Sequence, residues 1–406
     1  MSIPFARSLA RAVRFTLVPL AILAACQDRS TVVEPLDGPP SATLVDVSHA
    51  RATVSWNEVA RALVAKYATS APASIRGFAL LSVSQYDAIV AAERGEAGPT
   101  QPATAGAIAG ASAAVLAYVY PQEGAYLAAL VQQQKDAAAA PGRAAWEFES
   151  GETIGRAVAA AMIERAKTDG YFQPFTGTVP LCPGCWVAQP TPPAFATLGQ
   201  AKPYFLASNA QFRPAPPPAL GSPVFAAALA EVKRLADTRT PEQDSIAKFW
   251  ALPAGTIGAQ GYFNLVAAEL TVQYRRTERE TAHALALLNV AAYDAIVASH
   301  EAKYHYWLIR PSQADPTIVR AIGLPSFPAY PSNHSALAAS AATVLGALFP
   351  AERSRLDAMA AEGAISRLYG GIHYRFDTEA GMELGRRVAA WTLAHDVAGH
   401  QPFAFE

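Results

Sequence analysis

The chain has 406 residues, of which 51% are apolar and 16% are charged, and its formal net charge is −1. A chain of this length can bury a large core, and its few, balanced charges exclude an acidic disordered protein and a nucleic-acid binder that relies on a basic field. Much of the apolar content is alanine, the strongest helix former, so we expect packed helices.

The first 25 residues have the organisation of an export signal. Arginines precede a short apolar run from Phe15 to Ala25, which is too short for a spanning helix of about 20 residues. The run ends in Leu23-Ala24-Ala25-Cys26, which resembles the lipobox of bacterial lipoproteins. The resemblance implies that Cys26 carries a lipid anchor and, with Gln27 next, that the exported chain is held at the periplasmic side of the outer membrane. An ordinary cleaved signal with an incidental cysteine is the alternative.

Residues 26–50 are polar and contain prolines, so we interpret them as a tether. No later stretch approaches the uninterrupted apolar run of about 18 residues that is typical of a spanning helix. The lipid anchor is therefore the one membrane attachment that we expect.

Helical periodicity begins at residue 51 and predicts five helices, over 51–67, 75–92, 103–120, 126–140 and 144–167. We assign residues 51–170 to an N-terminal helical bundle. Residues 171–222 are a proline-rich crossover, because 12 of the 31 prolines lie between Pro174 and Pro223, and we expect it to run extended over the surface.

Helical periodicity returns at Ser222 and continues to Trp391, with proline-rich loops at 311–316 and 325–331. We therefore assign residues 223–406 to a C-terminal helical bundle. No run alternates with period two, so we expect few strands or none. The predicted fold is all-α, with two four-helix-bundle-like halves joined by the crossover.

An internal repeat supports two related halves. Residues 79–91 recur as residues 286–298 with ten of 13 positions identical, at an offset of 207 residues. Chance similarity between alanine-rich helices is the alternative, but the shared Tyr-Asp-Ala-Ile-Val favours corresponding helices in two bundles.

Two cysteines, Cys182 and Cys185, enclose a Pro-Gly pair. An exported chain meets an oxidising compartment, so we favour a structural disulfide. A zinc site would need two more ligands, and the chain has no second cysteine pair. A thioredoxin-like redox role would place the pair at a helix start after a strand, whereas prolines surround it here.

Three polar clusters interrupt the apolar sequence of the last third. They are Lys303 with Arg310, which have six residues between them; Phe327 followed by Ser332, Asn333 and His334; and Arg367, with His373 after five intervening residues and Asp377 after three more. Three cations that lie close together repel one another unless an anion sits between them, so their clustering would imply an oxyanion ligand.

The second and third clusters supply further groups for an anion site. Ser332 follows a proline and precedes a good helix, so we predict an N-cap that directs backbone N–H groups at the anion. We expect His373 and Asp377 on one helix face, where the carboxylate holds the Nδ1 proton and leaves Nε2 free. His334 adds an imidazole for proton transfer. Taken singly, each of these residues could be a surface charge, a local helix-terminal contact or a bare cap.

Together the clusters resemble the tripartite signature Lys-x6-Arg-Pro, Pro-Ser-Gly-His and Ser-Arg-x5-His-x3-Asp. Vanadium-dependent haloperoxidases and type 2 phosphatidic acid phosphatases, including bacterial acid phosphatases, share this signature. Further likeness to the haloperoxidase branch, in Asp294-Ala295, in Gly184-Cys-Trp186 and over 238–250, extends the resemblance roughly from Trp56 to the end. The resemblance implies an all-helical fold with two four-helix bundles.

The resemblance implies a role for each matched residue. A first group would bind the oxygens of vanadate or phosphate, namely Lys303, Arg310, Ser332, Asn333 and Arg367. His373 would coordinate the vanadium of vanadate, or form a phosphohistidine in a phosphatase. His334 would be the acid–base group, and Asp377 would orient His373.

Three positions bear on the reaction. Asn333 stands where the family usually has glycine; it keeps the backbone N–H, but its side chain would crowd the anion or add a donor. Ile309 replaces a tryptophan that is often found in haloperoxidases. Phe327 matches the aromatic residue of chlorinating members, so we expect it to wall a halide site.

The leading hypothesis is an exported haloperoxidase that uses vanadate as cofactor and hydrogen peroxide and a halide as substrates, with no nucleic-acid partner. The alternative is an acid phosphatase that cleaves a phosphate ester through a phosphohistidine in the same pocket. A non-catalytic phosphate-binding lipoprotein is the third reading, and His334, His373 and Asp377 speak against it. The halide and the oligomeric state stay open at this point.

Overall fold

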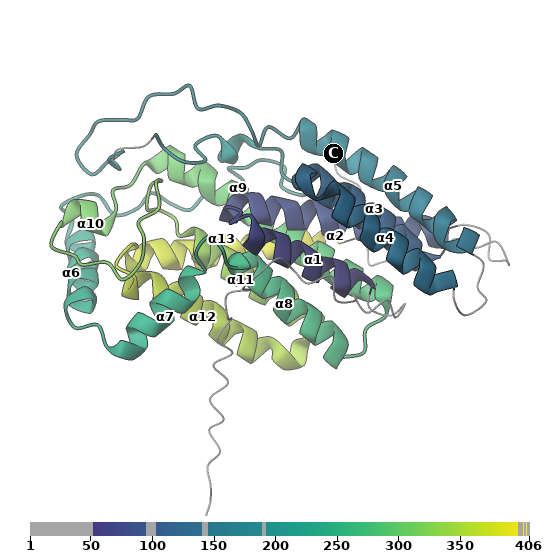
Figure 1. Cartoon of the computed structure of the whole chain (residues 1–406). Helices are drawn as coiled ribbons and strands as arrows, with labels where there is room; N and C mark the ends of the chain where they lie inside the picture. Colours follow the sequence, from purple (N-terminus) through teal and green to yellow (C-terminus); the bar gives the residue numbers. More distant parts are fainter. Residues whose placement is uncertain are drawn as a thin grey trace, which may run out of the picture. The chain divides into compact units, whose positions relative to one another are not determined.

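The structure is a computed structural model that describes residues 52–94, 103–139, 145–188, 192–396, 401 and 403. The predicted export signal, Cys26 and the tether lie outside these residues and stay predictions. The described residues form thirteen α-helices and three 3-10 helices without a strand, which confirms the all-α class (Figure 1). The α-helices are α1 (Ala52–Lys66), α2 (Ala71–Glu93), α3 (Thr104–Val119), α4 (Gly124–Ala139), α5 (Ala145–Lys167), α6 (Pro223–Asp237), α7 (Pro241–Ala251), α8 (Gly258–Gln273), α9 (Glu278–Tyr306), α10 (Pro311–Ala314), α11 (Asn333–Leu348), α12 (Arg353–Tyr369) and α13 (Arg375–Ala394).

Helices α1 to α5 begin and end within a few residues of the predicted bounds. The predicted loop at 311–316 is wrong in its first turn, where the structure has the short helix α10 with Pro311 at its start. Proline fits there because a first-turn N–H has no intrahelical partner to lose.

The described residues of the crossover form no α-helix, as predicted, but they do not run only over the surface. Its 3-10 helix Leu198–Gln200 packs on α9, and Leu198, Ala201 and Tyr204 belong to the main hydrophobic core. A Cβ on Gly199 would lie 2.4 Å from the backbone nitrogen of Glu301, so only glycine allows this close approach. The crossover therefore contributes side chains to the hydrophobic core as well as connecting α5 to α6.

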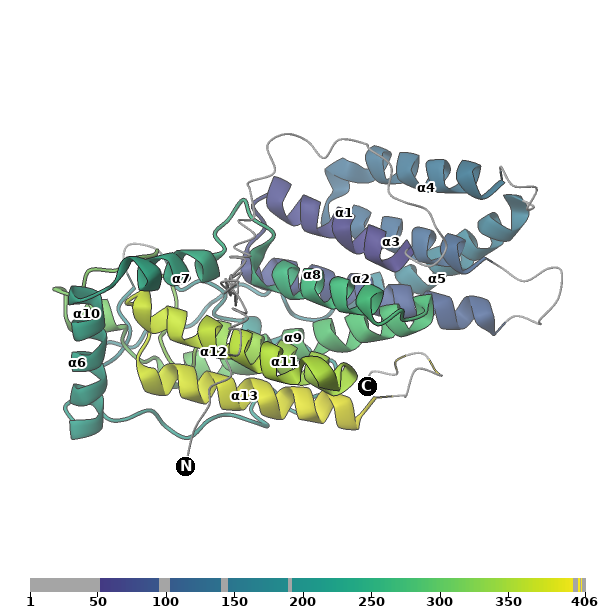
Figure 2. The ribbon, with the colours of Figure 1, turned by 90° about the horizontal axis from the view of Figure 1, so that it is seen from below.

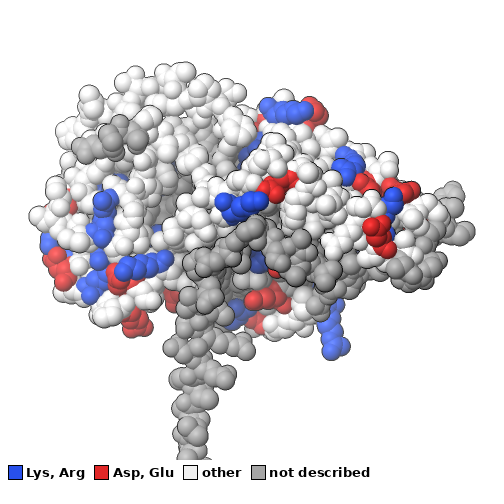
Figure 3. Space-filling view, viewed as in Figure 1, with Lys and Arg blue, Asp and Glu red and all other residues white. Residues whose placement is uncertain are grey.

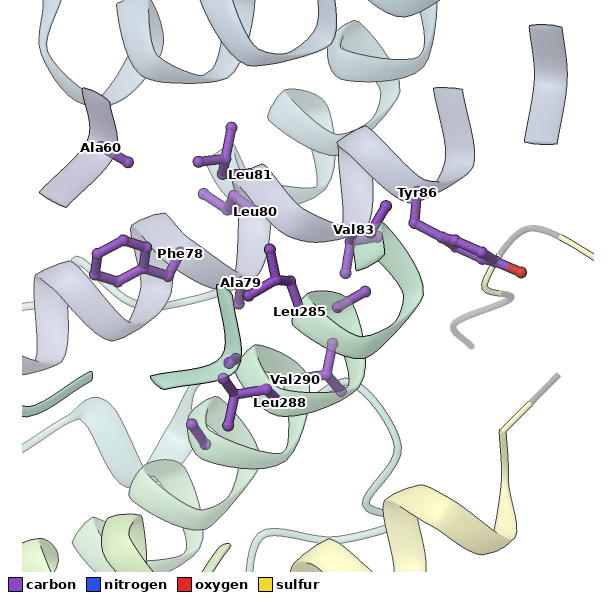
Figure 4. Packing of buried hydrophobic residues seen from close by; sticks show 14 of the residues in the cluster. Ala60, Phe78, Ala79, Leu80, Leu81, Val83, Tyr86, Leu285, Leu288 and Val290 are labelled. Carbon is purple, nitrogen blue, oxygen red and sulfur yellow. The ribbon is translucent and has the colours of Figure 1, made fainter. Parts of the chain in front are cut away.

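Two sets of four helices pack in the same way. In the first set α3 contacts α2, α4 and α5, and in the second set α11 contacts α9, α12 and α13 (Figure 2). The sets meet through α2 and α9, which carry the repeated segments 79–91 and 286–298. Figure 4 shows Ala79 and Val83 of α2 beside Leu285 of α9. The domain boundaries near residues 170 and 222 stay predictions.

The correspondence between the sets extends beyond the repeat seen in the sequence. Helix α1 corresponds to α8, and Asn57 donates from Nδ2 to Oδ1 of its counterpart Asn264, again 207 residues away, over 2.8 Å. Helices α3 and α11 are each followed by a 3-10 helix that starts with proline, Pro121–Glu123 and Pro350–Glu352. The chain is therefore built from two copies of one helical arrangement.

Glycines on α5 and α13 bring corresponding helix pairs into backbone contact. A Cβ on Gly151 would lie 2.1 Å from the carbonyl oxygen of Ala103, and a Cβ on Gly381 would lie 2.4 Å from that of Ser332. Ala103 and Ser332 are the corresponding N-caps of α3 and α11. Of these two N-caps, only Ser332, in the set formed by α9, α11, α12 and α13, is a predicted site residue.

Helix α9 has the length and hydropathy of a membrane span, but 94% of its most apolar window is buried inside the molecule. That burial is typical of a core helix. Lys303 and Arg367 lie in the C-terminal parts of α9 and α12, and Arg310 is the N-cap of the short helix α10. His334 and Asp377 lie in the first turns of α11 and α13. Because helix N-termini favour anions, this end of the second set suits an oxyanion.

Candidate active site

The predicted cations come together in the interior. Lys303, Arg310 and Arg367 are almost fully buried, and the charges of all three act on His373. By contrast, on the face seen in Figure 3 the cations are scattered among acidic and uncharged side chains. The positive field is therefore local to the site, which explains how a nearly neutral chain can contain it.

The ammonium group of Lys303 donates hydrogen bonds to backbone carbonyls of the protein itself. Its Nζ donates to the carbonyl oxygens of Pro328, Ala329 and Pro331, over 2.9, 2.8 and 2.5 Å. Three acceptors around one nitrogen require the ammonium form, although burial and the charge of Arg310 lower the pKa of Lys303 well below its ordinary value. Lys303 therefore holds the loop before Ser332 and contributes charge to the site rather than a free donor.

Arg310 connects that loop to the histidine of the third cluster. Its Nε donates to the carbonyl of Phe327 over 3.0 Å, and its Nη1 donates to the carbonyl of Ile372 over 2.8 Å and to Nε2 of His373 over 3.0 Å. Its buried Nη2 has no partner among the described residues. Burial lowers the pKa of Arg310 to about 10.

Arg367 near the end of α12 is held by weaker contacts. Its Nε donates to Oγ of Ser366 over 2.9 Å and its Nη2 to the carbonyl of Ala247 over 3.4 Å. Burial lowers the pKa of Arg367 to about 9. Asp377 is the carboxylate whose charge acts on both Lys303 and Arg310 in the described part of the chain. Three buried cations therefore have little negative charge to balance them.

His373 and Asp377 form the expected pair by an unexpected route. The prediction that both lie on one helix face is wrong, because His373 precedes α13 and Tyr374 is its N-cap with extended backbone. The Asp377 carboxylate reaches back to the start of the helix, where Oδ2 accepts from the Tyr374 N–H over 3.0 Å and from Nδ1 of His373 over 2.8 Å.

The tautomer of His373 follows from its two partners. Arg310 can only donate, so Nε2 carries the lone pair and Nδ1 carries the proton that Asp377 accepts. Burial and the neighbouring cations lower the pKa of His373 well below its ordinary value, so the ring is neutral. Burial raises the pKa of Asp377 to about 7. Nε2 of His373 is thus the nucleophilic or ligating atom.

His334 has one ring nitrogen with no bond to the protein. Its Nε2 is buried without a hydrogen-bond partner in the described residues, while a backbone hydrogen bond to Trp250 engages the ring elsewhere. Burial and the charge of Arg367 lower the pKa of His334 to about 3, so Nε2 carries a lone pair in the free protein. This nitrogen can accept and return a proton.

Ser332 is the N-cap of α11, as predicted, and its Oγ accepts from the N–H and the hydroxyl of Ser335 over 3.4 and 3.0 Å. Asn333 and His334 take the first two helical positions, where N–H groups have no intrahelical partner. The start of α11 therefore offers backbone donors and the positive end of a helix dipole.

Phe327 lies against the cations rather than apart from them. Its ring centroid is 5.2 Å from Nζ of Lys303 and 5.2 Å from the guanidinium carbon of Arg310. It is also 5.6 Å from the ring of His300. Phe327 therefore forms an aromatic wall beside two cations of the site, and its role at a halide site stays a prediction.

The segment before Arg310 is held by the cysteine loop. Cys182 and Cys185 form a disulfide, and Cys185 pairs with Leu308 in an antiparallel bridge. The Ile309 N–H donates to the carbonyl of Gly184 over 2.9 Å. The cysteine loop thus holds the backbone of Leu308 and Ile309, which directly precede Arg310.

The donor set fits a tetrahedral oxyanion such as vanadate or phosphate. Arg310 Nη2, which has no partner among the described residues, and the N–H groups at the start of α11 can donate to oxygens of a bound anion. The negative charge of such an anion would balance the buried cations. Two neighbours of the site were missed in the sequence, Ser299 and His300 of α9, which contact Asn333. Their position one turn before Lys303 was the available signal.

Comparisons with known proteins find similarity in sequence and in fold. Residues 283–397 match the sequence model of the PAP2 superfamily, whereas no curated protein matches the chain. The crystal structure of a bacterial vanadium-dependent iodoperoxidase superposes with a TM-score of 0.72 and 25% identity, covering 85% of this chain and 96% of that one.

A holo-type bacterial vanadium-dependent chloroperoxidase shares the same fold. Its TM-score is 0.61 at 14% identity, and the match covers 80% of this chain and 92% of the other. The apo-type chloroperoxidase gives 0.62 at 15% identity, covering 78% and 91%. Residues 283–397 therefore match the PAP2 superfamily, and the described chain shares its fold with the vanadium-dependent haloperoxidases.

Proposed function

We propose that the chain is a vanadium-dependent haloperoxidase, which oxidises a halide ion with hydrogen peroxide. The observation that carries the proposal is the buried group of Lys303, Arg310 and Arg367 around the neutral His373, with little negative charge to balance it. Similarity over 85% of the chain to an iodoperoxidase favours halide oxidation.

Several groups would hold vanadate. Arg310 through Nη2, Arg367 and the N–H groups at the start of α11 would donate to its oxygens, and Nε2 of His373 would be the ligand to vanadium. When bound there, vanadate would supply Lewis acidity toward hydrogen peroxide and make a peroxide oxygen electrophilic toward a halide.

His334 would act as the general acid–base group of this reaction. One hydrogen peroxide, one halide and one proton give hypohalous acid and water, so a proton must reach the departing oxygen. The lone pair of His334 Nε2 can take a proton from hydrogen peroxide and return it to that oxygen. The negative charge of a bound oxyanion would raise the pKa of His334 from about 3 toward the working range.

Phosphate-ester hydrolysis is the second candidate, because the His373–Asp377 pair also has the arrangement of an activated nucleophile. Nε2 of His373 would form a bond to phosphorus while the ester oxygen departs, and His334 would protonate the departing alcohol. Water would then cleave the phosphohistidine.

One assay separates these reactions. Protein freed of phosphate is tested for peroxide-dependent oxidation of iodide, bromide and chloride, with and without orthovanadate, beside hydrolysis of p-nitrophenyl phosphate. The proposal expects halide oxidation that depends on vanadate. Ester hydrolysis that vanadate inhibits, without halide oxidation, would establish the phosphatase instead. The absence of both activities would favour the non-catalytic phosphate-binding protein and overturn the proposal.

A further inference from the structure

The side chain of Asn333 is directed at helix α9. The hydroxyl of Ser299 donates to Oδ1 of Asn333 over 2.6 Å, and Nδ2 of Asn333 lies 3.5 Å from Nε2 of His300. Ser299 and His300 are both fully buried, and both lie about one helical turn before Lys303. The carboxamide therefore has a partner on each of its two polar atoms.

The orientation of this carboxamide is fixed by donor and acceptor chemistry. Nδ1 of His300 lies 3.0 Å from the carbonyl oxygen of Ile296, which can only accept, so Nδ1 carries the proton and Nε2 the lone pair. The amide nitrogen of Asn333, rather than its oxygen, must then face His300. Oδ1 is left to accept from Ser299, which is the bond observed. Both contacts therefore specify the same rotamer.

Backbone conformation does not require glycine at this position. Asn333 is the first residue of α11, and its φ is not among the positive values found in the described residues. What glycine offers in the related signature is the absence of a side chain beside the anion. In this chain the same clearance has to come from the direction in which the Asn333 side chain points.

Helix α9 holds the chain on both sides of Ser332. Lys303 binds the carbonyls of residues 328, 329 and 331 before it, and Ser299 and His300 bind residue 333 after it. We infer that Ser299 and His300 are positioning residues, which turn the Asn333 carboxamide toward α9 and keep the N–H groups at the start of α11 open to an oxyanion. This inference rests on the oxyanion site of the proposed function.

The test is the coupling between Ser299 and Asn333, with inorganic phosphate as the probe and calorimetry as the readout. Ser299→Ala removes the bond to Oδ1, so phosphate should bind roughly tenfold more weakly. In the N333G background there is no carboxamide to hold, and S299A should change the phosphate Kd by less than about twofold. The N333A background gives the same expectation if the glycine variant does not fold.

Ser340→Ala is the matched control. Ser340 is another buried serine, on α11, and its hydroxyl has no partner in the described part of the structure. Its loss should leave the phosphate Kd unchanged in every background.

Three outcomes would overturn the inference. If S299A weakens phosphate binding equally with and without the Asn333 carboxamide, Ser299 has a general structural role only. If S299A has no effect in the wild-type background, the bond to Oδ1 does not position the site. If the wild-type protein does not bind phosphate, the oxyanion site itself fails, and the proposed function fails with it. Because phosphate binding needs no turnover, a protein that binds phosphate but oxidises no halide would contradict only the proposed function.

Discussion

Arg310 donates a hydrogen bond from Nη1 to Nε2 of His373 over 3.0 Å. This bond places the lone pair of the imidazole at the nitrogen that faces the cations and leaves the proton on Nδ1, where Asp377 accepts it over 2.8 Å. The reactive tautomer is therefore set by the protein before any anion binds. An incoming oxyanion would take over the Arg310 donor and free Nε2.

Replacing Asp377 with asparagine should separate anion binding from turnover. Loss of the carboxylate removes negative charge near the anion, so phosphate should bind as tightly or more tightly. The imidazole loses its charged orienting partner, so kcat should fall at least about 100-fold, as when the carboxylate of a catalytic triad is replaced. Calorimetry and steady-state kinetics give the two quantities.

The matched control is Glu147→Gln, since Glu147 occupies the corresponding place in α5: its carbonyl accepts from the N–H of Ala103, just as that of Asp377 accepts from the N–H of Ser332. This variant should change neither quantity. Weaker phosphate binding in D377N, or undiminished kcat, would contradict the assigned role.

The paired glycines allow stability to be separated from function. In Gly381→Ala the new methyl group would meet the carbonyl of Ser332, and in Gly151→Ala it would meet that of Ala103. Each variant should lose about 1–3 kcal/mol of stability from overpacking. Only G381A displaces the N-cap of α11, so only G381A should weaken phosphate binding, by about tenfold or more. Equal phosphate affinities in the two variants would show that the position of Ser332 does not matter.

Anion affinity should increase as the pH falls. Burial first, and then Arg367, holds the pKa of His334 at about 3 in the free protein, and a bound anion would raise it, so the complex binds more protons than the free protein. Sulfate keeps its charge between pH 8 and 5, and its affinity over this range should rise on lowering the pH, by at most about tenfold per unit for each proton taken up.

His334→Ala should reduce this slope without abolishing it, because Asp377, with a pKa raised to about 7 by burial, loses its charge in the same direction. An affinity that does not change with pH, or an unchanged slope in H334A, would remove His334 from the site.

Arg367 should lower the stability of the anion-free protein and strengthen anion binding. It is buried without a carboxylate bonded to it in the described structure, and burial lowers its pKa to about 9. Arg367→Met should therefore leave Tm without anion equal to or above that of the wild type. Phosphate at 100 times its Kd stabilises the wild type by about 2.7 kcal/mol, and R367M should lose most of this gain. Arg355→Met, at an exposed arginine of the same helix, should keep it; the same loss there would point to a nonspecific charge effect.

The sequence was sufficient where local chemistry decides the structure. Alanine-rich periodicity located the helices, and a proline before Ser332 located its cap. Scarce charge made Lys303, Arg310 and Arg367 conspicuous. Each of these signals depends on residues that are near one another in the chain.

The remaining features depend on packing between distant segments. His373 falls outside α13 because Tyr374 is extended and Asp377 reaches back, which the four-residue spacing does not reveal. Lys303 donates its hydrogen bonds to the loop at residues 328–331, whose path depends on tertiary contacts. The contact of Ser299 with Asn333 exists only because α9 packs on α11.

Equilibrium dialysis with orthovanadate tests the central claim most directly. The wild-type protein should bind one vanadium per chain, and His373→Ala, which removes the ligating nitrogen but leaves the helices, should bind it far more weakly while keeping its circular dichroism spectrum. No vanadium bound to the wild type, or equal binding by the folded H373A variant, would contradict a vanadate site at His373.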